Sequence, residues 1–366
     1  MKNHNPVNER IKHKYRRFLK EARQQSEASV DAVERALAQF EGFNAYKDFK
    51  RFHHQQAVAF KKYLGKQTNP KTGKPLSKST MNRTMNCLKA FLQWLAREPG
   101  YKSAINYSDA EYFNMSEKDV RVATAKRQKR YPSLEQIKEV LSHMPFQTDI
   151  QKRDKALIAF SALTGARDSA IASFKLKHLD MEAGLVHQDA RDVKTKFSKT
   201  FDTVFFEVGD DIKQILQDWV DHLKNELLWA DCDPLFPSTK IEVIQNSGFQ
   251  ATGLKREHWK NAGPIRRIFR ESFQAAGLPT FNPHSFRDTL TSLGFKRCKS
   301  PEQFKAWSKN LGHEDVLTTL TNYGDISHER QKEIIQNLNS SENPSDSDVE
   351  EIARAVIKEM KKTKGE

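Results

Sequence analysis

The sequence contains little cysteine and no long apolar run, and each shortage excludes a class of protein. Only 3 of the 366 residues are cysteines, and Cys87, Cys232 and Cys298 lie too far apart to ligate zinc as a pair or to form a disulfide framework. The longest apolar stretch, about residues 156–163, is much shorter than the ~18 residues that cross a bilayer. The first residues form no hydrophobic signal region. We therefore expect a cytoplasmic protein that does not use a membrane.

Positive charge is concentrated in the first third of the chain. The protein carries 61 Lys and Arg against 47 Asp and Glu, a formal net charge of +14. Residues 1–130 hold 28 basic and 12 acidic residues, whereas residues 131–366 hold 33 and 35. Because neutralising phosphates releases counterions, such a block favours a polyanionic partner. We place nucleic acid above a merely basic surface, and an acidic membrane third, since no stretch pairs this charge with an exposed apolar face.

The first domain is predicted to be all-helical. Residues 1–28 are polar and basic, and we expect this segment to be only partly ordered. The domain proper spans residues 29–112, where apolar residues at helix spacing predict helices near 31–41 and 49–63. A Gly/Pro/Lys loop follows over residues 65–75. Next, Ser77 or Ser79 can cap an amphipathic helix that runs to Leu95.

The polar face of this last helix suits DNA. Asn and Arg side chains at one-turn spacing, with a lysine at each end, can reach base edges and phosphates in a major groove. For one helix alone a solvated face is the better interpretation, but the preceding basic loop and the charge of the region favour a DNA-binding domain. The candidate DNA-binding residues are Lys78, Asn82, Arg83, Asn86 and Lys89.

A linker and a mixed second domain are predicted next. We expect a linker over residues 113–131, a second domain over 132–340, and an acidic linker with a short amphipathic helix over 341–366. Ser133-Leu-Glu-Gln136 forms a capping box behind a proline, which marks the start of the second domain. Expected helices are 133–143, 149–163, 211–230, 264–276, 284–296 and 301–310; expected strands are 185–187 and 200–208. The pattern assigns nothing to residues 238–262.

Short motifs of the second domain carry chemistry as an ordered set. They are Thr164-Gly-Ala-Arg167, Lys194-Thr-Lys196-Phe-Ser-Lys199, His284-Ser-Phe-Arg287, Leu311-Gly-His313 and Asn322-Tyr323-Gly324. Each alone is weak, since a Leu-Gly-His is commonly a helix that ends at glycine. In this order they resemble the tyrosine recombinase (phage integrase) family. The resemblance implies a mainly α fold with a small β-sheet: a helical, SAM-like core-binding domain and an α+β catalytic domain of the DNA breaking-rejoining fold.

The residue types fit strand transfer at a DNA phosphodiester. Under the resemblance, Arg167 and Arg287 hold the phosphate oxygens through paired hydrogen bonds. Tyr323 attacks the phosphorus, forming a 3′-phosphotyrosyl intermediate, and His284 is the general base candidate. A lysine protonates the leaving 5′-oxygen; we assign this role to Lys196, with Lys194 as the alternative. His313 braces the transferring phosphate. We expect no metal and no ATP or other cofactor, since the sequence has no phosphate-binding glycine loop and no metal-binding carboxylate pattern.

Two positions depart from the family pattern. An acidic residue commonly sits three positions after the first arginine, where this chain has Ala170; the nearest acid is Asp168. This departure puts the bracing partner of Arg167 in doubt. The step from His313 to Tyr323 is also about one residue longer than the commonest spacing.

The resemblance implies double-stranded DNA recombination sites as the partner and four protomers on two duplexes. Accessory DNA-bending or directionality proteins are a further class of partner that it leaves open. The predicted function is integration or excision of a phage or other mobile element. The alternatives are a type IB topoisomerase, which relaxes DNA as a monomer, and a DNA-binding protein without catalysis. The tail helix is expected to dock either on its own domain or on a neighbouring protomer.

Overall fold

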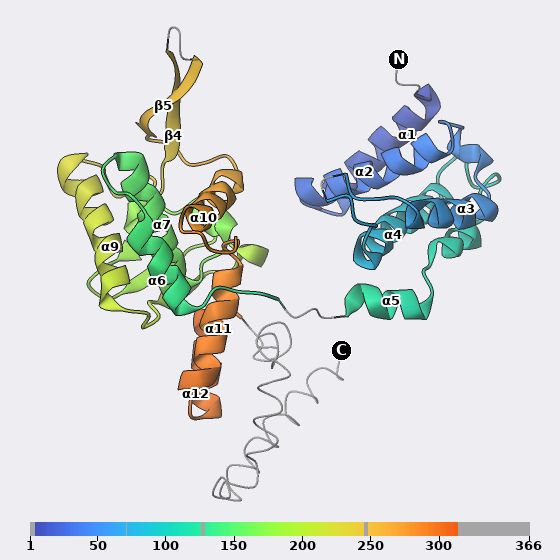
Figure 1. Cartoon of the computed structure of the whole chain (residues 1–366). Coiled ribbons are helices and arrows are strands. Elements are labelled where there is room, and N and C mark those ends of the chain that lie inside the picture. Colours follow the sequence, from blue (N-terminus) through green and yellow to red (C-terminus); the bar gives the residue numbers. More distant parts are fainter. Residues whose placement is uncertain (1–3, 71, 126–128, 245–247, 314–366) are drawn as a thin grey trace, which may run out of the picture. The chain divides into compact units, whose positions relative to one another are not determined.

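The structure is a computed structural model that describes residues 4–70, 72–125, 129–244 and 248–313 (Figure 1). The chain divides into two compact units, Met1–Arg127 and Gln128–Glu366. Helices dominate both units, and the strands form a three-stranded and a two-stranded sheet within the described residues. The prediction of a mainly α fold with little sheet is therefore confirmed.

The first unit is helical throughout its described residues. Its helices are α1 (Pro6–Arg17), α2 (Glu27–Phe43), α3 (His54–Gly65), α4 (Lys78–Leu95) and α5 (Glu117–Thr124), with a π-helical turn at Phe18–Ala22 and 3-10 turns at Phe49–Arg51 and Tyr107–Phe113. Four rings, those of Phe40, Phe60, Phe91 and Phe113, lie fully buried in its core. The Ser77 hydroxyl accepts a hydrogen bond from Thr80 N at 3.1 Å, so the predicted cap of α4 is confirmed at Ser77.

In the segment 1–28, expected to be only partly ordered, the described residues from 4 onward are largely helical. Helix α1 buries Ile11 and Tyr15 in the core of the first unit, and Leu19 follows in the π-helical turn. The buried Asn8 amide donates to Glu41 Oε1 and to the carbonyl of Lys47, both at 3.0 Å. The apolar residues recur every fourth position, which is a helix signal, but the basic residues between them obscured it.

The segment 113–131, expected to be a linker, contains helix α5. Ser116 caps this helix, and Val120 packs against the core of the first unit. An ion pair of 2.8 Å joins Lys78 of α4 to Asp119 of α5. The helix is only 8 residues long, so its apolar signal is too short to distinguish it from a polar connection.

The second unit combines helices with small antiparallel sheets. Its helices are α6 (Leu134–His143), α7 (Asp149–Thr164), α8 (Asp168–Ile171), α9 (Asp210–Asp221), α10 (Gly263–Ala275), α11 (Ser285–Arg297) and α12 (Pro301–Asn310). The three-stranded sheet has the order β1 (Leu179–Asp180), β2 (Leu185–Gln188), β3 (Phe201–Val204). All six predicted helices and both predicted strands of this unit are confirmed, with ends that differ by a few residues; the helix expected over 211–230 ends as a π-helical turn at His222–Glu226.

Helix α7 lies at the centre of the second unit and packs against α6, α9 and α11. Every residue from Ala156 to Thr164 is buried, so this helix contacts the core on all its faces. The Phe160 ring makes edge contacts with Phe174 and Phe236 at 5.3 and 5.2 Å between centroids. The helix ends at Gly165, whose φ of 58° places it in the left-handed region that favours glycine.

A two-stranded hairpin, β4 (Ser238–Ile244) and β5 (Gly248–Lys255), occupies the stretch that the sequence analysis left unassigned. It projects from the helices of its unit (Figure 1). Ile241 pairs with Ala251 and Val243 with Phe249, so these four residues share one face. The exposed fractions of Ile241, Val243 and Phe249 are 62, 71 and 82%. The alternation of Lys240-Ile-Glu-Val-Ile244 was the signal that could have revealed this hairpin.

In the described part of the chain, no helix has the length and apolar run that a bilayer crossing requires.

Replacing Gly165 by alanine should destabilise the second unit by about 2–4 kcal/mol, because a left-handed alanine and an overfilled core each cost energy. A β-carbon there would lie 2.9 Å from Leu290 and 3.0 Å from Leu311. Gly277→Ala is the matched control, since Gly277 also has a positive φ, 70°, but no atom within 4 Å of its β-carbon position. We expect the control to lose about 1 kcal/mol. Equal losses in urea unfolding would contradict the packing argument.

Candidate active site

The Thr-Gly turn positions the first arginine. The Thr164 hydroxyl donates to the carbonyl of Phe160 at 2.7 Å and accepts from Ala166 N at 3.1 Å, so the polar groups of the turn are satisfied inside the protein. Arg167 comes next, as the half-buried N-cap residue of α8. The end of a buried helix therefore sets the backbone position of Arg167.

The second arginine connects three of the predicted motifs. Arg287 lies in the first turn of α11 and is 2% exposed. Its Nη1 donates to the carbonyl of Gly165 at 2.6 Å, and its Nη2 donates to the carbonyl of Leu311. The same Nη2 lies 2.9 Å from Nε2 of His313. Because a guanidinium has a rigid planar fork, these bonds fix its orientation as well as its place.

The end of α12 brings His313 to this arginine. The side-chain amide of Asn310 accepts from Val204 N at 2.7 Å and donates to Val204 O at 2.8 Å, which ties α12 to strand β3. Gly312 then turns the chain with a φ of 71°, and the Phe201 ring occupies the space where a side chain would stand. His313 follows, 6% exposed. The Leu-Gly-His motif thus ends a helix and also places the His313 ring beside Arg287.

Burial and positive charge keep both histidines of the site neutral. Desolvation, followed by the charges of Arg287 and Arg167, lowers the pKa of His313 to about 3. His284, the N-cap residue of α11, keeps an exposed edge, but desolvation of its ring and the charge of Arg287 lower its pKa to about 4. Since Nη2 of Arg287 can only donate, Nε2 of His313 accepts, and its proton sits on Nδ1. The charges of Arg287 and Arg167 contribute to both lowered pKa values, so these four side chains lie within electrostatic reach of one another.

The loop between β2 and β3 carries both candidate lysines. Lys194 and Lys196 are exposed, and the Nζ atom of Lys196 lies 4.7 Å from the centre of the Phe197 ring. The charge of Lys196 contributes to the lowered pKa of His313, whereas the charge of Lys194 contributes to the lowered pKa of His258. Desolvation is the largest cause of both shifts, and the charge of Lys196 adds to the lowered pKa of His313.

The remaining predicted residues have different outcomes. Tyr323 lies outside the described residues, as does the predicted tail helix. Asp168 accepts hydrogen bonds from Arg266 Nε at 2.6 Å and from Ser169 N at 2.8 Å. The sequence analysis missed Arg266, because a partner almost a hundred positions away leaves no local signal.

The predicted DNA-binding helix, α4, has two kinds of polar side chain. Arg83 and Asn86 are exposed and Asn82 is half-buried. The lysines at the two ends of the predicted polar face form ion pairs within the first unit: Lys78 with Asp119 at 2.8 Å, and Lys89 with Glu111 at 2.7 Å. The centre of this face is therefore more available to a ligand than its ends.

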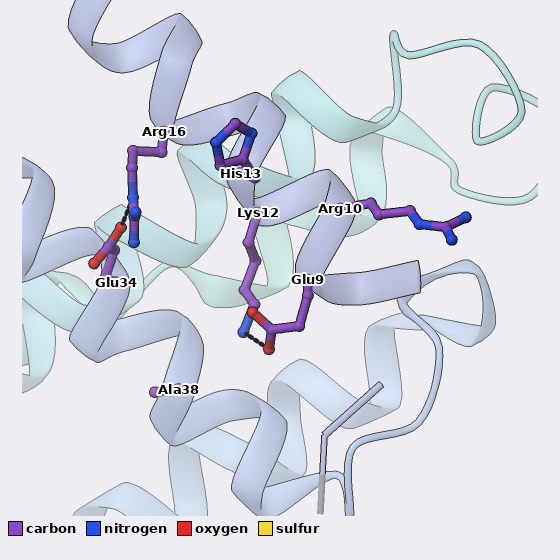
Figure 2. A pocket seen from close by; sticks show the side chains of 7 residues that line it. All are labelled: Glu9, Arg10, Lys12, His13, Arg16, Glu34 and Ala38. Atoms are coloured by element: carbon purple, nitrogen blue, oxygen red, sulfur yellow. Dashed lines mark hydrogen bonds and ion pairs between the residues drawn. The ribbon is translucent and has the colours of Figure 1, made fainter. Parts of the chain in front are cut away.

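A hollow of about 770 Å³ lies in the first unit between α1 and α2 (Figure 2). Figure 2 shows Lys12 turned toward Glu9 and Arg16 turned toward Glu34. Lys12 also contacts Glu41 at 2.5 Å. The acids offset these cations, and none of the predicted site residues lines the hollow, so its size does not make it the active site. Among the described residues no cluster of His, Cys, Asp or Glu is arranged to hold a metal ion.

Comparison with known families covers both units. The family described as "Phage integrase family" matches residues 132–330. The family described as "Phage integrase, N-terminal SAM-like domain" matches residues 13–99. The second match begins inside α1, in agreement with the ordered position of that helix.

Curated relatives and solved structures point the same way. The chain is 22% identical to the tyrosine recombinase XerC of Lactobacillus delbrueckii subsp. bulgaricus, over 68% of this chain and 72% of the relative. It is 21% identical to XerD of Oceanobacillus iheyensis, over 71% and 75%. A lambda integrase dimer bound to a COC′ core site matches with a TM-score of 0.59 at 13% identity, covering 87% of this chain and 96% of that one. The Tn1549 transposon integrase in complex with transposon right end DNA matches with a TM-score of 0.56 at 17% identity, covering 90% and 99%. These structures share the fold.

Acid should destabilise the folded protein through His313. The pKa of this histidine is about 3 in the folded state against 6.5 for an ordinary histidine. The unfolded chain therefore binds more protons below pH 6.5, and stability falls as the pH drops from 6.5 toward 3. His313→Gln keeps an acceptor for Arg287 and removes the titration. Between pH 7 and pH 5 the wild type should lose about 2 kcal/mol more than this variant in urea unfolding. An equal loss in both proteins would rule out a buried neutral His313.

Proposed function

The chain belongs to the phage integrase family of tyrosine recombinases, and from this premise we propose that it cleaves and rejoins duplex DNA at specific sites through a 3′-phosphotyrosyl intermediate. The observation that carries the proposal is the position of Arg287, whose guanidinium bonds to the Thr-Gly turn and to the Leu-Gly-His motif. Arg167 comes two residues after that turn, so one buried cation organises the phosphate-binding groups.

Arg167 and Arg287 are proposed to hold the non-bridging oxygens of the scissile phosphate. Negative charge on these oxygens increases as the phosphorus becomes pentacovalent, and arginine keeps its proton throughout. Internal hydrogen bonds orient Arg287 before DNA arrives, so little reorganisation is needed when the charge develops. The two arginines are thus proposed to stabilise the negative charge of the transition state.

Two proton transfers are proposed, one to a neutral histidine and one from a cationic lysine. Tyr323 oxygen forms a bond to phosphorus, and the phenol proton passes to His284, which is neutral and able to accept it. The bond from phosphorus to the 5′-oxygen breaks, and Lys196, with Lys194 as the alternative, donates a proton to that oxygen. His313 donates Nδ1–H to the transferring phosphate. One phosphodiester replaces another, so rejoining needs no ATP.

Helix α4 is proposed to contribute sequence preference. Its exposed Arg83 and Asn86 can donate to base edges, whereas Lys78 and Lys89 reach phosphates only by exchanging their carboxylate partners. The basic first third of the chain supports binding to the duplex. We propose four protomers on two duplexes, acting in the cytoplasm in the integration or excision of a phage or other mobile element.

Tyr323→Phe should abolish covalent attachment to DNA while leaving binding intact, because only the nucleophilic oxygen is removed. The test uses nicked suicide duplexes made from the DNA that flanks the gene, scored for a covalent band in a denaturing gel. Loss of the covalent band with unchanged mobility shifts is the expected result. A covalent adduct of the variant would refute the assignment of Tyr323.

Arg83→Ala combined with Asn86→Ala should weaken DNA binding by about 1–3 kcal/mol and relax its sequence preference. Lys78→Ala is the comparison variant: a phosphate contact should weaken binding to all sequences alike and reduce the salt dependence. Binding isotherms with the suicide duplex and with a scrambled duplex measure both effects. Unchanged discrimination in the double variant would show that this face does not contact bases.

A further inference from the structure

We propose that Ser173 and Ser169 are positioning residues that clamp the lysine loop onto helix α8, so that the general-acid lysine is held in register with Arg167. This inference rests on the proposed function, because it concerns the lysine that protonates the leaving 5′-oxygen.

The clamp consists of hydrogen bonds on both sides of one residue. The backbone N–H of Lys194 donates to the Ser173 hydroxyl at 2.9 Å. The backbone carbonyl of Lys194 accepts from the Ser169 hydroxyl at 3.3 Å. Ser173 is 5% exposed and its own hydroxyl donates to the carbonyl of Ala170 at 2.9 Å, which leaves its oxygen free to accept from the loop.

The clamp ties the loop to the element that carries the first arginine. Arg167 is the N-cap of α8, Ser169 lies inside this helix, and Ser173 follows directly after its last turn. The two serines therefore join the backbone of the lysine loop directly to α8. A shift of α8 therefore moves Arg167 and the backbone of Lys194 together, and with them the base of the loop that carries Lys196.

The first limb of the loop has a second anchor. Asp192 forms an ion pair of 2.8 Å with Lys175, and Val193 beside it is buried. The tip beyond Lys194 is built differently: Phe197 and Ser198 both have positive φ values, 61° and 51°, and the Phe197 ring is 77% exposed. Such backbone is strained and is held only by its surroundings. The clamp thus holds the backbone two residues before Lys196.

Ser173→Ala removes the acceptor of the Lys194 N–H and keeps the remaining packing. Ser161→Ala is the matched control, since Ser161 is also a fully buried serine, and its hydroxyl bonds only within α7, to the carbonyl of Leu157 at 2.8 Å. We expect Ser173→Ala to cleave the suicide duplex about tenfold more slowly, as expected for the loss of one well-formed bond, and the control to cleave it as the wild type does.

A changed leaving group distinguishes positioning from stability. In a suicide duplex with sulfur in place of the bridging 5′-oxygen, the leaving thiolate needs little help from an acid, because a thiol has a much lower pKa than an alcohol. Ser173→Ala should then cleave this duplex at the wild-type rate, as should Lys196→Ala or, for the rival assignment, Lys194→Ala. If Ser173→Ala slows both duplexes equally, or neither, the positioning role is overturned.

A measurement on the free protein separates this inference from the proposed function. If neither lysine variant responds to the sulfur substitution, the general-acid assignment fails, and the clamp is then judged by amide hydrogen exchange. Ser173→Ala should speed exchange in the peptide around Lys194 about tenfold and leave exchange in α7 unchanged. Unchanged exchange around Lys194 would overturn the clamp irrespective of the chemistry.

Discussion

The second unit depends on one buried cation. The guanidinium of Arg287 bonds to the carbonyls of Gly165 and Leu311 and to the ring of His313. Burying a charge is costly unless it is hydrogen-bonded, so these contacts offset the cost of burying this guanidinium. Both accepting carbonyls lie at turns with a left-handed glycine: Gly165 at the end of α7, and Gly312 directly after Leu311.

Burial and nearby positive charge together keep the two histidines His284 and His313 neutral. Desolvation is the largest cause of the lowered pKa of His313, about 3, and the charges of Arg287, Arg167 and Lys196 lower it further. If Arg167 and Arg287 hold a phosphodiester as proposed, its negative charge would raise the pKa of both histidines. Under the proposed function, DNA binding would therefore change the proton affinity of both histidines.

Local patterns predicted the elements well. The predicted capping box at Ser133 begins α6, because a cap involves residues only three positions apart. The hairpin β4–β5 was missed because its alternating residues do not face a core, and helix α1 because basic residues interrupt its apolar stripe. The helix in the expected linker was too short for periodicity to reveal.

By itself the sequence determined the charge of the first third, the order of the motifs and the residue types that suit a phosphate. Only the tertiary structure decided which of them act together: Arg287 with a carbonyl 122 positions away, Asp168 with Arg266, and the backbone of Lys194 with two serines of another segment. It also showed that Lys78 and Lys89 already have acidic partners. The physical reason is that helix periodicity and caps act over a few residues, whereas burial and long-range hydrogen bonds arise only when distant segments pack together.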